Sequence, residues 1–220
     1  IKWIYMKQVK IMVVSKRKIK RLFIIIIISS AGIYLLISLY FFGHFNYNTV
    51  INGVNVSLKS YKNIEDIINA YIKKYELLLI ERNGETEIIT SQDIDMRYNK
   101  TNFSYQIRHL QNPFLWFSSL FKIKKYYIKD LYVYNELLLD KKIESLQCLS
   151  RDFTEPRNVD FKYTDGSYEI INEIYGNKIN KINLKKAITK FISEGKQILD
   201  LNLMGCYENP KYTINSEKTL

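Results

Sequence analysis

The chain has 220 residues, of which 33 are Lys or Arg and 22 are Asp or Glu, so its formal net charge is +11 at neutral pH. Residues 1–42 hold eight of the basic residues and no acidic residue, and subtracting these eight from +11 leaves +3 for residues 43–220. The excess charge is therefore concentrated near the N-terminus, and no nucleic-acid-binding motif accompanies it. We exclude nucleic acid as a predicted partner.

Residues 22–42 form a run of 21 uncharged residues directly after the basic segment Lys16–Arg21. At about 1.5 Å per residue, a helix of that length spans a hydrocarbon core of roughly 30 Å. Short loops rich in Lys and Arg stay inside the cell, which predicts a cytoplasmic N-terminus and an external C-terminal region.

Two alternatives to a membrane anchor are open at this point. A cleavable signal peptide has a shorter apolar core of roughly 7–15 residues and ends in small residues, whereas this run ends in Tyr40, Phe41 and Phe42. A buried helix of a soluble core would carry a polar face. We therefore predict a single-pass anchor in the cell membrane, with membrane lipid as a partner of residues 22–42.

Helical and strand patterns alternate after the anchor, which predicts an α+β fold built from mixed strand–helix–strand units. The predicted elements, in chain order, are a strand at 49–56, a helix at 64–74, strands at 76–82 and 85–90, a helix at 102–110, a strand at 126–134, a helix at 135–146, strands at 159–164 and 167–172, a helix at 184–194 and a strand at 197–203.

The helices at 64–74 and 184–194 follow one template. Each has an Asn before an apolar stripe of helical period, Asn63 in the first and Asn183 in the second, and Gly195 predicts the end of the second helix. A strand is predicted after each helix. This similarity indicates a duplicated strand–helix–strand unit, or else chance likeness between two amphipathic helices.

Two β-hairpins are predicted from Xaa-Gly dipeptides between apolar runs. Asn83-Gly84 joins the strands at 76–82 and 85–90, and Asp165-Gly166 joins those at 159–164 and 167–172. In the second hairpin Phe161 and Tyr163 share one face because side chains alternate along a strand.

No recognisable catalytic or metal-binding motif is present in the sequence. We therefore expect no cofactor and no metal site. Cys148 and Cys206 lie outside the membrane in the predicted topology, where they either form a disulfide or remain as thiols, with Cys148 at the end of an apolar stripe.

The 18 tyrosines suggest a second kind of chemistry. Exposed Tyr rings can stack on sugar rings, and neighbouring Arg or Lys can pair with carboxylates, which together suit a glycan–peptide polymer. The candidate ligand-binding residues are Arg97, Tyr98, Arg108, Tyr126 and Tyr132. The alternative is that these tyrosines belong to the core.

Several segments, taken in order, resemble the non-catalytic part of Gram-positive L,D-transpeptidases. They are residues 48–57 (NTVINGVNVS) with the helix that follows, residues 160–176 (DFKYTDGSYEIINEIYG), the helix from Leu184 and residues 206–212 (CYENPKY). The resemblance implies a membrane anchor followed by peptidoglycan-binding domains, with a catalytic domain last. It therefore implies peptidoglycan as a partner and a location facing the cell wall.

The resemblance also implies a cysteine nucleophile in a Ser/Thr-His-Gly-Cys setting, but Met204-Gly205-Cys206 lacks the His. We expect no catalysis from this chain and a catalytic domain downstream; the alternative is an anchor module without a catalytic part. The expected organisation is 1–21 basic segment, 22–42 membrane helix, 46–90 strand–helix–hairpin unit, 91–205 peptidoglycan-binding domain and 206–220 linker. The alternative functions are an enzyme that uses Cys206, and an envelope spacer or protein-interaction module that binds no glycan.

Overall fold

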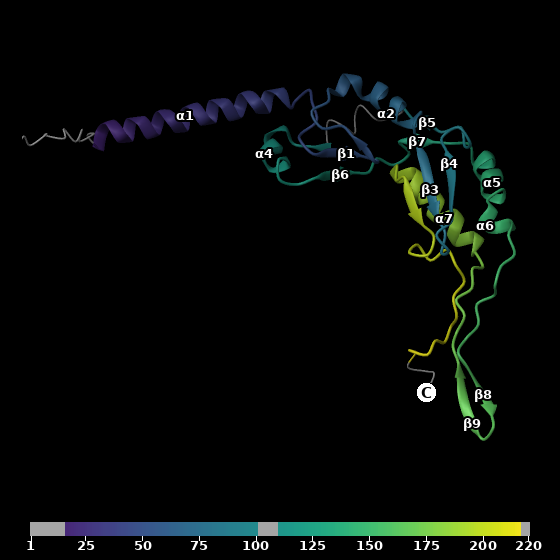
Figure 1. The fold of residues 1–220 in the computed structure, drawn as a ribbon. Helices are drawn as coiled ribbons and strands as arrows, with labels where there is room; N and C mark the ends of the chain where they lie inside the picture. The colour runs from purple at the N-terminus through teal and green to yellow at the C-terminus, as the bar shows by residue number, and fades with distance from the viewer. Residues whose placement is uncertain (1–15, 101–109, 217–220) are drawn as a thin grey trace, which may run out of the picture.

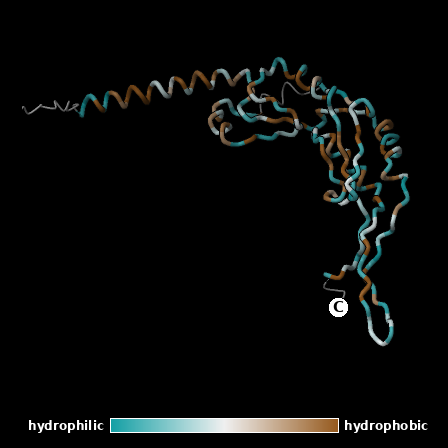
Figure 2. Tube along the Cα trace, in the orientation of Figure 1, coloured by the Kyte–Doolittle hydropathy of each residue, from teal (hydrophilic) through white to brown (hydrophobic). Residues whose placement is uncertain are grey.

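The N-terminal helix α1 (Lys16–Tyr40) projects from the rest of the protein in the computed structural model, which describes residues 16–100 and 110–216 (Figure 1). It is long and apolar enough to cross a membrane, with a mean hydropathy of 2.6 in its most apolar window. Figure 2 shows that hydrophobic residues predominate along the helix, and its apolar side chains are exposed along almost the whole length. The predicted helix at 22–42 is thus confirmed, and it begins six residues earlier.

The folded region after α1 contains helices and strands throughout, so the predicted α+β class is confirmed. The short elements are β1 (Thr49–Ile51), β2 (Val54–Asn55), η1 (Tyr61–Asn63), β5 (Arg97–Tyr98), η2 (Pro113–Leu115), α4 (Trp116–Ser119), β6 (Lys124–Tyr126), β7 (Tyr132–Val133), α6 (Gln147–Ser150) and β10 (Ile198–Asp200). The longer elements are α2 (Ile64–Ile72), β3 (Glu76–Ile80), β4 (Thr86–Thr90), α5 (Glu136–Glu144), β8 (Asp160–Thr164), β9 (Ser167–Ile171) and α7 (Lys181–Glu194).

Two three-stranded sheets combine strands that are distant in sequence. One has the order β2-β1-β6, in which β1 and β6 are parallel, and the other has the order β10-β3-β4, in which β10 and β3 are parallel. Both sheets therefore pair strands from the expected 46–90 unit with strands from the expected 91–205 region. The start of the expected 206–220 linker is also packed, because Cys206 and Tyr207 are buried.

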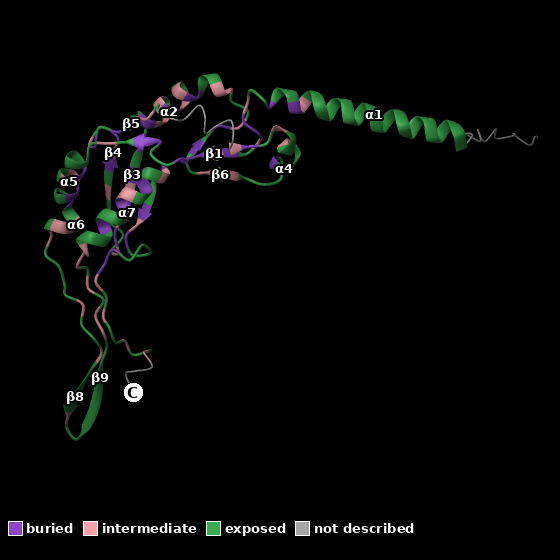
Figure 3. Cartoon of the chain, turned by 180° about the vertical axis from the view of Figure 1, so that it is seen from behind, coloured by how far each residue is buried: buried purple, intermediate pink, exposed green. Residues whose placement is uncertain are grey.

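A single hydrophobic core connects the second sheet with α2, α5 and α7. Its fully buried members include Leu77, Leu79, Ile89, Ile188 and Leu199. The alternating burial along β3 follows from the two-residue side-chain period of a strand. Figure 3 shows this buried region as the purple centre of the body.

The sequence placed several boundaries correctly. Asn63 precedes α2, the side chain of Asn135 caps α5, and Gly195 ends α7 in the left-handed conformation with φ 65°. Both predicted hairpins form, as β3–β4 and β8–β9. The predicted helix at 102–110 lies almost entirely outside the described residues.

Three boundary predictions were wrong. The 49–56 strand is in fact the hairpin β1–β2, turning at Asn52 and Gly53, which both have positive φ. The 126–134 strand is broken into β6 and β7, which belong to different sheets. The cap of α7 is Asn180, whose side chain accepts a hydrogen bond from the backbone N–H of Asn183 at 3.0 Å, so the helix begins one turn earlier.

Each of the two similar helices is followed by a strand, as predicted. The strands β3 and β10, which follow α2 and α7, lie side by side in one sheet with Leu79 opposite Leu199. Residues 176–180, directly before α7, form no strand, and Ile179 makes an isolated bridge with Tyr207.

Arg82 ties the C-terminal segment to this sheet. Its guanidinium donates to the backbone carbonyls of Tyr175 and Gly176 and to the side-chain oxygens of Asn202 and Asn209, at distances of 2.7–3.1 Å. It also lies 4.3 Å above the ring of Tyr207. Because these contacts occupy four of its five N–H donors, Arg82 serves as a structural link and not as a ligand-binding cation.

Candidate functional site

A cavity of about 250 Å³ lies where the β2-β1-β6 sheet meets the C-terminal end of α7. We call it the junction cavity. It is lined by Val50, Asn52, Gly53, Lys125, Tyr126, Tyr127, Glu194, Gly195 and Lys196. Its volume is slightly below the roughly 300–1,000 Å³ of typical small-molecule sites, so it suits one sugar ring or one peptide side chain.

Asn52 holds the two sides of the junction cavity together. This side chain is almost fully buried, and its amide nitrogen donates to the carbonyls of Ile128 at 3.0 Å and Ser193 at 2.8 Å. Its amide oxygen accepts from the backbone N–H of Ile128 at 2.8 Å, and the Tyr132 hydroxyl donates to its backbone carbonyl at 2.7 Å. All polar groups of a buried side chain are thereby satisfied, which fixes the wall of the cavity.

Two glycines allow the walls to approach this closely. A Cβ atom on Gly53 would collide with the carbonyl oxygen of Gly195, and one on Gly195 would collide with the carbonyl oxygen of Asn52. Both glycines also have positive φ, at 81° and 65°, which other residues rarely adopt. The contact between the two turns therefore requires glycine at both positions.

Two tyrosines of the α2 region fix the part of the cavity wall that Gly195 and Lys196 form. The Tyr71 hydroxyl donates to the carbonyl of Gly195 at 2.6 Å, and the Tyr75 hydroxyl donates to that of Lys196 at 2.7 Å. Burial raises the pKa of Tyr71 to about 12, and it raises the pKa of Tyr75 as well. Both hydroxyls are therefore protonated donors at neutral pH, and residues 195–196 are held rigidly.

The lining offers aromatic surface beside cations. Tyr127 is 55% exposed and Tyr126 is half-buried, while Lys125 has no ion pair with any described carboxylate. Lys196 pairs with Glu194 at 2.6 Å and lies 4.9 Å above the Phe191 ring. This arrangement can contact the face of a sugar ring and pair with a carboxylate on the same ligand.

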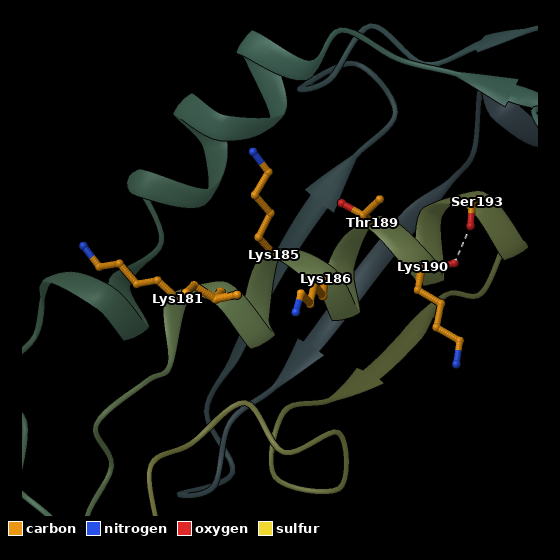
Figure 4. A pocket seen from close by; sticks show the side chains of 7 residues that line it. Lys181, Lys185, Lys186, Thr189, Lys190 and Ser193 are labelled. Carbon is orange, nitrogen blue, oxygen red and sulfur yellow. Dashed lines mark hydrogen bonds between the residues drawn. The ribbon is translucent and has the colours of Figure 1, made fainter.

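A shallow, open groove of about 710 Å³, lined by residues of α7 alone, runs along the exposed side of that helix and ends at Ser193, which directly precedes Glu194 of the junction cavity. We call it the α7 groove. Its cations are Lys181, Lys185, Lys186 and Lys190 (Figure 4). Lys185 points to the opposite side of the helix from Lys190 (Figure 4) and pairs with Asp140 of α5 at 2.5 Å. The other three have no ion pair among the described residues, so they are available to an anionic ligand.

The four predicted contact residues that the structure describes do not form one site. Tyr126 lines the junction cavity, whereas Arg97, Tyr98 and Tyr132 lie on the β5–β7 ribbon, with Tyr98 opposite Tyr132. Arg97 is exposed but forms a bidentate pair with Asp95 at 2.7 and 3.0 Å. Tyr132 is only 4% exposed, so its ring packs in the core and we do not retain it as a contact residue. Arg108 lies outside the described residues.

Sequence reasoning missed most of the site. It missed the lysines of the α7 groove and the role of Asn52, although two signals were present. Four lysines in one amphipathic helix with a single acidic residue indicate a basic face, and Asn52-Gly53 is the same hairpin dipeptide that was recognised at Asn83-Gly84. The contact between Asn52 and Ser193, 141 residues apart, has no local signal.

The thiols have the properties of packed side chains. Both are free in the structure, and a disulfide between them stays a prediction. Burial raises the pKa of Cys206 to about 11, and burial together with the Glu87 carboxylate raises the pKa of Cys148. A protonated thiol is a weak nucleophile, which argues against catalysis by Cys206. Across residues 16–100 and 110–216, no cluster of three His, Cys, Asp or Glu side chains could hold a metal ion.

Comparison with known proteins gives one match. The model of a family described as "Putative peptidoglycan binding domain" matches residues 88–200, a little over half of the chain. This range includes α7 and, of the junction cavity, Lys125, Tyr126, Tyr127 and residues 194–196. No curated protein and no solved structure matches the chain.

Proposed function

The chain belongs to the peptidoglycan-binding domain family whose model matches residues 88–200, and from this premise we propose that it binds cell-wall peptidoglycan through the junction cavity and the α7 groove. The observation that carries the proposal is the presence, within the matched range, of two tyrosines and two lysines around one rigid cavity. In this proposal Tyr126 and Tyr127 contact a sugar ring, and Lys125, which has no ion pair with a described carboxylate, pairs with a carboxylate of the stem peptide, while Lys196 stays paired with Glu194.

The exposed lysines of the α7 groove extend the same surface. A single exposed ion pair contributes only about 0–1 kcal/mol, so no one lysine can hold a ligand. A polymer with repeated carboxylates contacts several lysines at once, and linked contacts add through effective concentration. The groove therefore suits a long polyanionic ligand better than a small free anion.

The proposed location follows from α1. We propose that α1 crosses the cell membrane with Lys16–Arg21 on the cytoplasmic side and the folded region facing the wall, because short basic segments stay inside. In this orientation the peptidoglycan-binding surface and its ligand lie on the same side of the membrane.

We further propose that the module holds an L,D-transpeptidase domain of the same Gram-positive protein near its substrate. The resemblance of residues 48–57, 160–176 and 206–212 to such proteins supports this part of the proposal. The coding sequence after Leu220 tests it. A Ser/Thr-His-Gly-Cys motif within the following few hundred residues is expected, and its absence would contradict the targeting role.

The experiment that tests peptidoglycan binding is co-sedimentation of the detergent-solubilised chain with purified sacculi. The wild-type chain is expected to be retained, and the double variant Tyr126→Ala/Tyr127→Ala is expected to bind at least about tenfold more weakly. A matched control is Tyr163→Ala/Tyr168→Ala, which also removes two tyrosine side chains, but from the exposed β8–β9 hairpin. Retention no greater than that of an unrelated membrane protein would overturn the proposal, and equal losses in both double variants would overturn the choice of site.

A second candidate function, a protein-interaction module, is favoured by the same hairpin. Phe161, Tyr163, Tyr168 and Ile170 lie on one face of β8–β9 and are 50–75% exposed. For this function, the chain would not bind to sacculi but would retain a protein partner. Binding of that partner would be lost in Tyr163→Ala/Tyr168→Ala and kept in Tyr126→Ala/Tyr127→Ala.

A further inference from the structure

An exposed apolar surface lies directly beside the C-terminal end of α1. It consists of residues from η2, α4 and the turn that follows, and we call it the η2–α4 patch. Its members are Phe114, Leu115, Phe117, Leu120, Phe121 and Ile123, which are 39–78% exposed. Six large apolar side chains exposed within ten residues exceed what a water-facing loop normally shows, which marks an interaction surface.

The η2–α4 patch is continuous with the surface of α1. The ring of Trp116 lies 5.5 Å from that of Tyr34 and 6.3 Å from that of Phe41, and Phe114 lies 5.8 Å from Phe42. The Tyr34 hydroxyl also donates a hydrogen bond to the carbonyl of Phe114. The segment therefore folds back along the last two turns of the helix (Figure 1).

Hydrogen bonds fix this segment to the chain that leaves α1. The side chain of Gln111 accepts from the backbone N–H of Asn46 at 3.0 Å and donates to the carbonyl of His44 at 2.9 Å. The amide of Asn48 donates to the carbonyl of Ser119 at 2.9 Å. The position of the patch relative to the helix end is thus set by polar contacts on both sides of α4.

The depth of the contact agrees with a membrane interface. Tyr34 precedes the end of α1 at Tyr40 by six residues, which is about 9 Å at 1.5 Å per residue. Interfacial segments bury their apolar face about 5–10 Å into the boundary between headgroups and acyl chains. The aromatic side chains Trp116, Tyr34 and Tyr40 are of the types enriched at that level.

The charges next to the patch suit the same partner. Residues 110–129 contain no Asp or Glu, and besides Lys125, which lines the junction cavity, they include Lys122, Lys124 and Lys129. Lysines that follow an apolar segment can extend toward the headgroups, where anionic lipids attract them. The apolar face and the flanking cations therefore match a lipid surface that contains anionic headgroups.

We propose that the η2–α4 patch inserts into the outer interface of the bilayer that α1 spans, as a second membrane contact. This inference rests on the proposed anchoring by α1. The two contacts together fix the orientation of the folded region on the membrane, since a single helix would leave it free to rotate. The junction cavity, formed in part by the strand β6 that follows the patch, is then held at a constant height above the lipid.

Depth-dependent fluorescence quenching tests the insertion. The full chain is placed in nanodiscs of phosphatidylcholine and phosphatidylglycerol, with Trp3→Phe, Trp116→Phe and Phe121→Trp, so that a single tryptophan reports from the patch. Brominated lipids are expected to quench this tryptophan at least twofold, most strongly with bromine near the glycerol. The matched control, Trp3→Phe, Trp116→Phe and Phe161→Trp on the β8–β9 hairpin, is expected to change by less than about 10%.

Two further measurements separate the inference from its premise. Resistance of the chain to carbonate extraction reports anchoring by α1, and chemical cross-linking reports a second copy of the chain. If the chain resists carbonate extraction but the tryptophan of Phe121→Trp is not quenched, the insertion is overturned and the anchoring by α1 stands. This holds whether or not cross-linking shows that a second copy of the chain covers the patch. Release of the chain by carbonate would overturn both the anchoring and the insertion.

Discussion

The hairpins β3–β4 and β8–β9 are built from the same local pattern and have opposite surroundings. Each consists of two five-residue strands with a positive-φ glycine between them, Gly84 with φ 85° and Gly166 with φ 86°. The strand β3 has Leu77 and Leu79 fully buried and pairs with β10 on its other edge. All ten residues of β8 and β9 except Thr164 are exposed, and the described residues pair no third strand with them (Figure 3).

The difference shows that local sequence sets the shape of a hairpin while packing sets its contribution to stability. A two-stranded hairpin is marginally stable by itself, and it needs a third strand or a packed face. The first hairpin has both, so its side chains belong to the core. The second has neither, so its apolar face is free to serve binding, and changes there should alter interactions more than folding.

The largest effect that tests this comparison is expected for Leu79→Ala. Leu79 is fully buried in the central strand, so the substitution removes apolar contacts and leaves a cavity, which should lower the free energy of unfolding by about 2–5 kcal/mol. Denaturant unfolding of the full chain in detergent, followed by circular dichroism, measures the change. A loss below about 1 kcal/mol would contradict the central place of β3 in the core.

A smaller effect is expected from raising the pH. Burial raises the pKa of Tyr71 to about 12 in the folded state, whereas an unfolded tyrosine has its ordinary pKa of 10.0. Below pH 10 both states keep the proton, and between pH 10 and 12 only the unfolded state loses it, so the free energy of unfolding should fall as the pH rises through this window.

The variant Tyr71→Phe supplies the control for this pH effect. It should unfold with a shallower pH dependence than the wild type above pH 10, and the remaining slope comes from the other groups whose pKa values burial raises, among them Tyr75, Tyr98 and Tyr132. Unfolding curves at several pH values from 8 to 12 measure both slopes. Identical slopes for the two proteins would contradict the buried state of the Tyr71 hydroxyl.

The sharpest matched pair is Gly84→Ala and Gly166→Ala. A Cβ at either position meets open space, so both substitutions introduce the same backbone strain and no collision. Alanine in a left-handed conformation costs roughly 1–2 kcal/mol. Gly84→Ala should lower the free energy of global unfolding by about that amount, whereas Gly166→Ala should leave it within about 0.5 kcal/mol.

Hydrogen exchange distinguishes where the strain of each glycine variant appears. Amide protons of β8 and β9 should exchange faster in Gly166→Ala, while those of β3 and β10 should not change. Equal losses of global stability in the two variants would show that the β8–β9 hairpin unfolds together with the core, and the comparison would then fail.

The smallest effect on stability is expected for Tyr163→Ala. Its ring contacts Tyr168 across the hairpin with centroids 5.1 Å apart but is 63% exposed, so the free energy of global unfolding should change by less than about 0.5 kcal/mol. The same denaturant titration measures it beside Leu79→Ala. A loss above 1 kcal/mol would reveal packing of the hairpin that its exposure does not indicate.

The sequence by itself determined the elements whose signals are local. An uninterrupted apolar run predicted α1, apolar periodicity predicted α2, Gly195 predicted the end of α7, and Xaa-Gly dipeptides predicted both hairpins. These predictions were confirmed because helix stripes, caps and tight turns depend on residues within a few positions of one another. The same rule applied to Asn52-Gly53 would have found the β1–β2 hairpin.

Only the tertiary structure decided which of these elements meet and which side chains they bury. The parallel pairing of β3 with β10, the burial of Tyr132 and the junction cavity join residues about 70 to 140 positions apart. Such contacts depend on the summed packing of the core and on backbone approach at Gly53 and Gly195, and no short segment encodes them. The amphipathic pattern of β8–β9 likewise predicted an apolar face, but only the fold showed that this face remains exposed.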